Sequence, residues 1–78
     1  MILIDVRTKE EYDGGHIEGA ILFDIMDMMQ EIYPNYPKDA EISLYCESGN
    51  RSMMAKIMLE KAGFTKITDA GSIDNLRE

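Results

Sequence analysis

One cysteine of the chain stands where its neighbours can make it a nucleophile. Cys46 follows a short apolar run and precedes small and polar residues with a glycine among them, and an amphipathic segment over residues 53–62 comes next. This order is typical of a strand, a tight loop and a helix. The sequence therefore predicts a thiol at the N-terminal end of a helix.

A thiol in that position lies in an electropositive backbone environment. The first turn of a helix has N–H groups without partners and about half a positive charge, and a loop from Cys46 to Arg51 would direct further N–H groups at the sulfur. Such surroundings lower the pKa of a cysteine from about 8.5 to between about 3.5 and 7.5. We therefore expect a nucleophilic thiolate at neutral pH. The residues expected around it are Glu47, Ser48, Gly49, Asn50, Arg51 and Ser52.

A packing role is the alternative for Cys46. Buried free cysteines are common and inert, and a lone cysteine judged by composition alone is more often part of a core. Here the cysteine stands at a strand end, before a glycine-containing loop, a helix start and an arginine. That combination favours catalysis over packing.

Charged residues also follow the first predicted strand. Residues 2–4 with Val6 form a short apolar run, after which Asp5 and Arg7 stand at the strand end. Ligands of open parallel sheets bind beyond the carboxyl ends of the strands, so both charges are predicted at the active edge. The structural alternative is that Asp5 caps a turn and Arg7 forms an ion pair, for example with Glu11.

Short helices are predicted between the strands. Thr8 and Glu11 fit a capping box that opens a helix ended by the glycines at 14 and 15. A second strand is predicted over 20–23, followed by a helix over 24–33 that Asp24 begins. In that helix the predicted apolar stripe consists of Met26, Met29 and Tyr33, with Ile25 and Ile32 beside it, and fills the core.

The remaining elements are a reactive strand, a third helix and a last strand. The strand over 41–45 delivers Cys46, and Gly63 is the predicted left-handed end of the third helix, with Phe64 as its apolar anchor. A last strand is predicted over 66–68, before a helical turn starting at residues 71–73. The inner side of the third helix is predicted to carry Met54, Ile57, Met58 and Lys61.

Alternating strands and helices indicate an α/β domain. Strand, helix and strand in turn imply right-handed crossovers, and hence a small parallel β-sheet flanked by helices on both faces. The 78 residues make one domain, over 1–78, with a few kcal/mol of net stability in the usual range for this size. The sequence leaves monomer and dimer open.

Composition excludes several function classes. A net charge of −7 with eight scattered basic residues argues against nucleic-acid binding. A single cysteine permits neither an internal disulfide nor a cysteine-rich metal site, and no cofactor is implied. The N-terminus lacks a secretion signal and no apolar run approaches membrane-spanning length, so a cytoplasmic protein without a membrane partner is predicted.

Four segments in order give the chain a family resemblance. Residues 4–8 (IDVRT), 15–20 (GHIEGA), 45–52 (YCESGNRS) and 62–64 (AGF) together resemble a rhodanese-like domain, a single-domain sulfurtransferase of the thiosulfate sulfurtransferase family. The resemblance implies the rhodanese fold in a form shortened at its N-terminus, since the chain begins at the strand that carries Asp5. In such domains the segment around His16 is mostly architectural, although a histidine can also act as a base.

The resemblance implies a sulfur-transfer cycle. Cys46 would take sulfane sulfur from a donor such as thiosulfate, hold it as a persulfide, and pass it to a thiophilic acceptor such as a thiol, cyanide or a small redox protein. The loop amides would stabilise the persulfide anion. Arg51 would either offset negative charge there or brace the loop by pairing with a carboxylate.

Two further functions use the same residues. One is a phosphatase or arsenate reductase that uses the same cysteine. Four residues separate Cys46 from Arg51, one fewer than in tyrosine-type and cell-cycle protein phosphatases, so the loop favours a single sulfur atom over a tetrahedral oxyanion. A non-catalytic interaction module is the other alternative, against which the intact cysteine and arginine argue. Glu47 beside the pocket would repel thiosulfate, which suggests a protein persulfide or polysulfide as donor.

Overall fold

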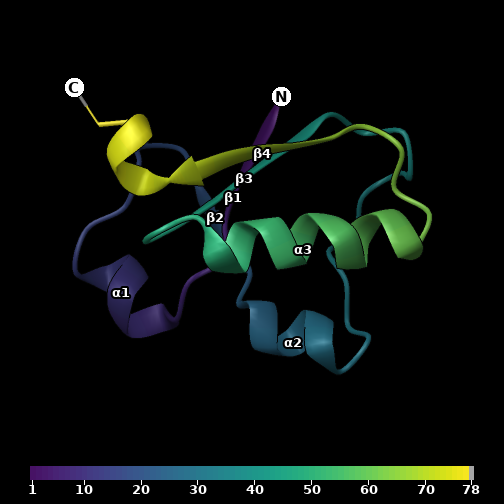
Figure 1. The fold of residues 1–78 in the computed structure, drawn as a ribbon, viewed down its shortest axis with the longest axis horizontal. Helices are drawn as coiled ribbons and strands as arrows, with labels where there is room; N and C mark the ends of the chain where they lie inside the picture. The colour runs from purple at the N-terminus through teal and green to yellow at the C-terminus, as the bar shows by residue number, and fades with distance from the viewer. Residues whose placement is uncertain (78) are drawn as a thin grey trace.

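Four parallel strands form the central sheet of the structure, a computed structural model that describes residues 1–77. Along the chain the elements are β1 (Ile2–Asp5), α1 (Lys9–Asp13), β2 (Ile21–Leu22), α2 (Ile25–Met29), β3 (Ile42–Cys46), α3 (Asn50–Lys61), β4 (Ile67–Ser72) and the 3-10 turn η1 (Ile73–Asn75) (Figure 1). The strand order is β2-β1-β3-β4. The predicted α/β fold with a small parallel sheet is confirmed, and none of the helices described is long and apolar enough to cross a membrane.

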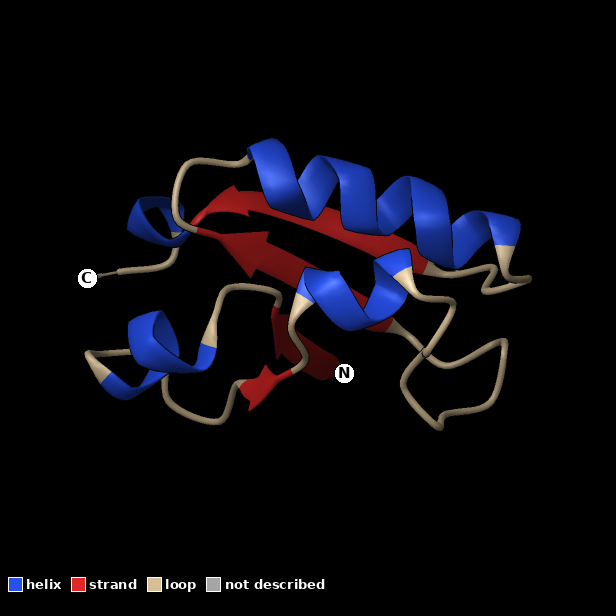
Figure 2. Ribbon diagram, turned by 90° about the horizontal axis from the view of Figure 1, so that it is seen from below, coloured by secondary structure: helices blue, strands red, loops and turns tan. Residues whose placement is uncertain are grey.

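Side chains of successive strand residues point to opposite faces of the sheet, and a separate hydrophobic core lies on each face. The larger core lies under α2 and α3, which Figure 2 shows beside the strands, and it contains Ile4, Leu44 and Cys46 among its buried residues. The smaller core surrounds Tyr45 and Ile73 and is covered by η1 and the segment before β2. One face is therefore covered by two helices, and the other by a single helical turn and a loop.

The carboxyl ends of the strands meet at one edge of the sheet. In Figure 1 this edge lies at the left, where β4 points, α3 begins and α1 and η1 flank it. β1 and β3 pair in register up to Asp5 and Tyr45, so the chain after each strand emerges at the same place. Cys46, the last residue of β3, is thereby delivered to the edge predicted for the active site.

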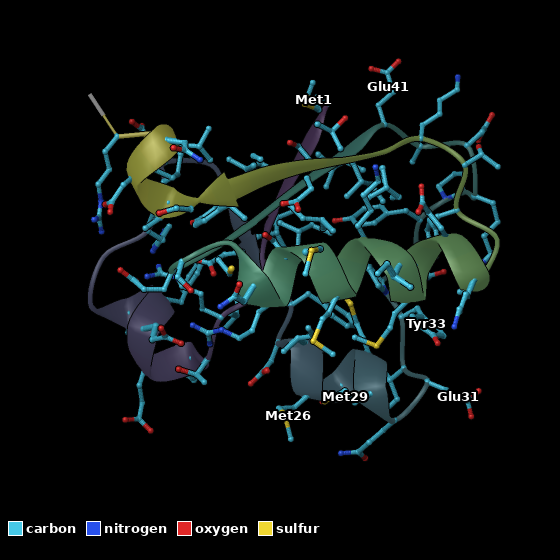
Figure 3. All side chains as sticks on the ribbon, viewed as in Figure 1. Met1, Met26, Met29, Glu31, Tyr33 and Glu41 are labelled. Carbon is cyan, nitrogen blue, oxygen red and sulfur yellow. The ribbon has the colours of Figure 1, made fainter. Side chains whose placement is uncertain are left out.

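α2 is shorter than predicted and turns a different face to the core. The helix predicted over 24–33 ends at Met29. The predicted stripe is wrong for Met26 and Met29, which are 55% and 53% exposed, and Met28 is buried in their place. Ile25 and Tyr33 do pack in the larger core as predicted. Met26 points away from α3 in Figure 3. Apolar residues occur on both sides of this helix, so its sequence alone does not show which side faces the core. The direction in which the chain leaves β2 sets that side.

The predicted inner face of α3 is right for Met58, which packs against the larger core, and wrong for the other residues. Met54 and Ile57 are 46% and 49% exposed, and the buried residues are Ser52, Ala55 and Leu59. These three are spaced by three and then four residues and so share one side of the helix. The small Ser52 and Ala55 let the helix axis lie close to the sheet, which larger methionines at those positions would prevent.

Helix ends follow the sequence more closely than helix faces. Thr8 and Glu11 form the predicted capping box of α1, and Asp24 accepts a hydrogen bond from the backbone of α2 as its N-cap. Gly63 has the left-handed φ of 103° predicted after α3, and Phe64 is 2% exposed. These local signals need no tertiary context, because each satisfies backbone groups that the helix itself leaves unpaired.

The outer strands have different lengths from those predicted. β2 is limited to Ile21–Leu22, and β4 continues to Ser72, well beyond the predicted 66–68. The extension includes a bulge, since Leu44 pairs with Asp69 but Tyr45 pairs with Gly71. The final helical turn consequently begins at Ile73, not at Gly71, and the end of β4 lies beside Cys46.

Candidate active site at Cys46

Backbone amides of the loop surround the sulfur of Cys46. The amide of Gly49 donates to Sγ at 3.0 Å, and the amide of Ser52, in the first turn of α3, donates at 3.3 Å. Gly49 has a φ of 98°, which turns the chain sharply enough to present its own N–H to the sulfur. The structure thus has the predicted strand, tight loop and helix start, with amides directed inward.

The environment of Cys46 favours its ionised form. Burial raises the pKa of the Cys46 thiol, but hydrogen bonding from Ser52 and from the amides of Gly49 and Ser48 outweighs it, so the pKa lies below its ordinary value of 9.0. Donors aimed at a sulfur stabilise its anion, which is the usual means of lowering a thiol pKa. The geometry therefore supports a thiolate.

The sulfur lies beneath the loop and not on the open surface. Cys46 is 0% exposed and belongs to the larger core, while Glu47, Ser48 and Asn50 above it are exposed. The surroundings of the buried thiol are not purely apolar, because the amides of Gly49 and Ser52 donate hydrogen bonds to Sγ. A reagent reaches Sγ only by displacing side chains at the rim of the loop.

Two serines fix the loop to its surroundings. Ser52 Oγ donates to the carbonyl of Gly49 at 3.1 Å, and Ser72 Oγ, at the end of β4, donates to the carbonyl of Glu47 at 2.7 Å. Backbone atoms of Gly71 and Ser72 also lie 3.7 Å from the position of a Cβ on Gly49. The loop is therefore held from α3 and from β4, which keeps its amides in place.

Arg7 lies on the β1 side of the loop and joins three segments. Its guanidinium forms a bidentate pair with Asp5, with Nε to Oδ1 at 3.0 Å and Nη2 to Oδ2 at 2.8 Å. Nη2 also donates to the carbonyl of Gly15 at 2.7 Å, and Nη1 donates to Oε1 of Glu47 at 2.9 Å. The hydrogen bonds to Asp5 raise the pKa of Arg7 above its already high value, so its charge is permanent.

Arg51 lies on the α1 side of the loop and pairs with Glu11. Nη1 and Nη2 of Arg51 donate to the two carboxylate oxygens at 2.6 and 2.9 Å, a bidentate arrangement. These hydrogen bonds lower the pKa of Glu11 to about 2. They also raise the pKa of Arg51, to which the charge of Cys46 adds. The predicted bracing of Arg51 by a carboxylate is thus present.

The expected partner of Arg7 was wrong. Glu11 pairs with Arg51, and Arg7 pairs with Asp5 and Glu47. The capping box turns Glu11 toward the start of α3, whereas Asp5 is two residues from Arg7 and buried with it. Sequence alone could not choose between two arginines and three carboxylates that meet only in the folded chain.

His16 has only local contacts among those the structure describes. It is exposed, its ring stacks on Tyr12 with centroids 3.7 Å apart, and Nδ1 lies 2.9 Å from the carbonyl of Tyr12. These contacts favour the architectural interpretation over a role as base. Sequence reasoning gave Glu11 the wrong arginine and missed Ser72, because a strand-end serine gives no signal of belonging to a site.

Within residues 1–77 no group of three or more histidine, cysteine or acidic side chains could hold a metal ion. A cavity of about 300 Å³ lies at the other edge of the sheet, lined by Met1, Glu41, Ile42, Thr65, Lys66, Ile67 and Thr68. Met1 and Glu41 lie at the top of Figure 3. This cavity is at the amino ends of the strands and contains none of the residues that contact Cys46.

Similar proteins include established sulfurtransferases. The chain is 32% identical over 74 residues to the thiosulfate sulfurtransferase PspE of Escherichia coli, matching 94% of the chain and 71% of PspE. It is 34% identical over 77 residues to thiosulfate sulfurtransferase 16, chloroplastic, of Arabidopsis thaliana, of which it spans 64%. These relatives support sulfur transfer as the general activity.

A solved structure and a family model agree with this similarity. A structure described as rhodanese with anions from E. coli superposes with a TM-score of 0.84 at 31% identity, covering 95% of this chain and 88% of the other. The family model that matches is the rhodanese-like domain, over residues 1–74. The fold, the cysteine loop and these matches agree, and the chain belongs to the rhodanese-like domain family.

Proposed function

We propose that the protein is a sulfurtransferase that carries sulfane sulfur as a persulfide on Cys46. The observation that carries the proposal is the pair of amides, from Gly49 and Ser52, directed at a sulfur whose pKa is lowered. Such donors stabilise a thiolate before the reaction. They are equally suited to the anion of a persulfide, whose terminal sulfur would lie within the same loop.

The first half of the cycle is attack on the donor. The thiolate of Cys46 attacks the outer sulfur of the donor, the S–S bond of the donor breaks, and the remaining fragment leaves with the bonding electrons. With thiosulfate the leaving fragment is sulfite, and the enzyme holds Cys46–S–S⁻. The charges balance without a proton, since a monoanion and a dianion give a monoanion and a dianion.

The second half returns the thiolate. A nucleophilic acceptor, which can be cyanide, a thiol or a small redox protein, attacks the terminal sulfur and Cys46 leaves as the thiolate. The loop amides lower the cost of each anionic state, because they are fixed by Ser52 and Ser72 before the donor arrives. No metal or organic cofactor takes part in either step.

Arg51 has a positioning role in this proposal. Two of its N–H groups, one on each terminal nitrogen, donate to Glu11, so we assign it to bracing the loop between α1 and α3. Its positive charge still favours an anion at Cys46, since the two charges interact. The soluble donor and acceptor partners fit a cytoplasmic location, which we infer together with the function.

Mass spectrometry of the intact protein tests the proposal. Incubation with thiosulfate is expected to add one sulfur atom to the chain, and later addition of cyanide to remove it with release of thiocyanate. Cys46→Ser is expected to gain no sulfur and to release no thiocyanate. A chain that gains sulfur equally well with serine at this position would contradict the assignment.

Two alternatives predict other results. A cysteine-dependent phosphatase would hydrolyse an aryl phosphate and gain no sulfur, and the loop, with four residues between cysteine and arginine, disfavours it. A non-catalytic interaction module would do neither. The aligned amides and the lowered pKa at Cys46 argue against the second alternative, because a module that only binds a partner needs no activated thiol.

A further inference from the structure

The carboxylate of Glu47 occupies the part of Arg7 that faces the reactive loop. The guanidinium has three donor groups, and Nε and Nη2 are directed at Asp5 and Gly15. Nη1 remains, and it donates to Oε1 of Glu47 at 2.9 Å. Glu47 follows Cys46 directly in the chain, so this ion pair joins Arg7 to the residue next to the reactive cysteine.

The two side chains of this ion pair differ in burial and therefore in how easily they can move. The side chain of Arg7 is 3% exposed and that of Glu47 is 49% exposed. A buried guanidinium with a bidentate partner cannot turn, whereas a half-exposed carboxylate can move into water. Glu47 is therefore the displaceable member, and its carboxylate lies where an anionic group of a donor would otherwise contact Arg7.

The charges around the loop do not favour small anions. The guanidiniums of Arg7 and Arg51 are matched against the carboxylates of Asp5, Glu47 and Glu11. Two positive and three negative groups leave one net negative charge at the rim, before the thiolate is counted. A dianion approaching Cys46 meets repulsion from this charge, and the positive charge of each guanidinium is already paired with a carboxylate.

We propose that the Arg7–Glu47 ion pair determines donor specificity, making Cys46 accept sulfur from monoanionic alkyl persulfides in preference to the dianion thiosulfate. The proposal rests on the proposed sulfurtransferase function and names its class of donor. In the favoured step, the monoanion R–S–S⁻ takes a proton from water to become R–S–SH, and the Cys46 thiolate attacks its outer sulfur. The donor S–S bond breaks, and R–S⁻ leaves with the electron pair and takes the proton of the new persulfide, so that Cys46–S–S⁻ and R–SH are formed. Cys46 then carries the persulfide, and no oxidant or reductant is needed.

Glu47→Gln tests the proposal without disturbing the core. The side chain is half exposed, and an amide keeps an oxygen that Arg7 can donate to while the negative charge is removed. The KM for thiosulfate is expected to fall by roughly three- to ten-fold with kcat nearly unchanged, and the KM for cysteine persulfide by less than about two-fold. The gain with thiosulfate is expected to shrink as salt is added, because ions screen exposed charges.

Glu60→Gln is the matched control. Glu60 is an exposed carboxylate in the last turns of α3, so this substitution changes the net charge equally but away from the loop. It is expected to leave both KM values unchanged. An equal effect of the two substitutions, or no change in the KM for thiosulfate with Glu47→Gln, overturns the proposal.

Alkylation of Cys46 measures the same discrimination without sulfur transfer. Iodoacetate is a monoanion and iodoacetamide is neutral, so the ratio of their rates reports the field at the sulfur and cancels changes in thiolate fraction. Glu47→Gln is expected to raise the ratio of the iodoacetate rate to the iodoacetamide rate by roughly two- to three-fold, less than the effect on a dianion. An unchanged ratio overturns the proposal.

The two assays separate this proposal from the function on which it rests. A protein that takes sulfur from neither donor contradicts the sulfurtransferase assignment, and the alkylation ratio then still decides whether Glu47 controls anion access. A protein that uses thiosulfate as readily as cysteine persulfide, with an unchanged ratio in the variant, keeps the function and loses the specificity determinant.

Discussion

Arg7 and Arg51 stand on opposite sides of one loop and are held by the same chemistry at very different burial. Arg7 and Asp5 have side chains 3% and 0% exposed, and Arg51 and Glu11 have side chains 34% and 30% exposed. We refer to Asp5, Arg7 and Glu47 as the inner cluster and to Glu11 and Arg51 as the outer cluster. Both clusters contain a bidentate arginine–carboxylate pair.

The difference between the clusters separates two functions of an arginine. Breaking a buried pair leaves an unpaired charge without water, which costs far more than breaking an exposed pair. The inner cluster therefore fixes the end of β1 and the segment at Gly15 to the loop, as part of the fold. The outer cluster joins α1 to α3, and breaking it lowers the free energy of unfolding by an amount that still leaves the chain folded.

The largest expected effect comes from breaking the inner cluster. Asp5 is 0% exposed, and Asp5→Asn removes the negative charge that pairs with the buried guanidinium of Arg7. We expect the free energy of unfolding to fall by about 3 kcal/mol. Urea unfolding followed by circular dichroism measures this change. In a chain of this size a variant that is already unfolded without urea also meets the expectation.

Asp13→Asn is the control for the inner cluster. Asp13 forms an ion pair with Lys9 at 2.5 Å, but both side chains are more than half exposed. The expected loss is below about 0.5 kcal/mol, as for other exposed pairs one helical turn apart. Similar losses for Asp5→Asn and Asp13→Asn would show that burial does not distinguish these pairs.

An intermediate effect is expected from strain within the loop, with both clusters left in place. Gly49→Ala puts a side chain on a residue with a φ of 98°, which costs about 1–2 kcal/mol of stability. Any shift of the Gly49 amide away from Sγ raises the pKa of Cys46, so the pH profile of alkylation by iodoacetamide should move to higher pH.

Gly19→Ala is the control, because it places a side chain on another residue with a positive φ. Gly19 has a φ of 86° and open space around it, and it lies outside the Cys46 loop. We expect a comparable loss of stability with an unchanged pH profile of alkylation. A profile that shifts as far as that of Gly49→Ala would mean that general destabilisation, and not the loop amide, controls the thiol.

The smallest effect is expected from the outer cluster. Glu11→Gln weakens a partly exposed ion pair and one arm of the capping box, where Glu11 accepts from the amide of Thr8, and should cost about 1 kcal/mol. Urea unfolding at neutral pH measures the loss. A loss as large as that of Asp5→Asn would contradict the distinction between the clusters.

The pH dependence of this loss has a definite sign. The pKa of Glu11 falls from 4.5 to about 2 on folding, so the unfolded chain binds more protons between these values. The stabilisation by Glu11 is complete above about pH 4.5 and disappears as the pH falls toward about 2. The difference in unfolding free energy between the original chain and Glu11→Gln should therefore narrow over that window, and a constant difference would contradict the ion pair.

The order of the elements along the chain, the helix caps and the loop could be predicted from the sequence because each has a local physical cause. Thr8 and Asp24 satisfy the first amides of their own helices, and Gly63 can adopt the left-handed conformation that ends one. The failures concern which side of a helix is buried. In α2 and α3, methionines and isoleucines surround the helix, so periodicity could not distinguish the buried face from the exposed one.

Partners across long sequence separations could not be predicted either. Arg7 reaches Glu47 and Arg51 reaches Glu11 over 40 residues in each case. Charge gives no preference among several arginines and carboxylates, and only the meeting of β1, α1 and the loop at one sheet edge selects the pairs. The same applies to Ser72, which the bulge in β4 brings to the carbonyl of Glu47.

The order of the elements, the family resemblance and the place of Cys46 between a strand and a helix can be read from the chain alone, because turn, cap and strand preferences act between near neighbours. The surroundings of the sulfur follow only from the folded arrangement. Packing of α3 on β3 and β4 aims the amide of Ser52 at Sγ, and the shared edge of β1 and β3 brings Arg7 to Glu47. Contacts between residues far apart in the sequence depend on how the sheet aligns the ends of its strands, and the conformational preferences of single residues do not determine that alignment.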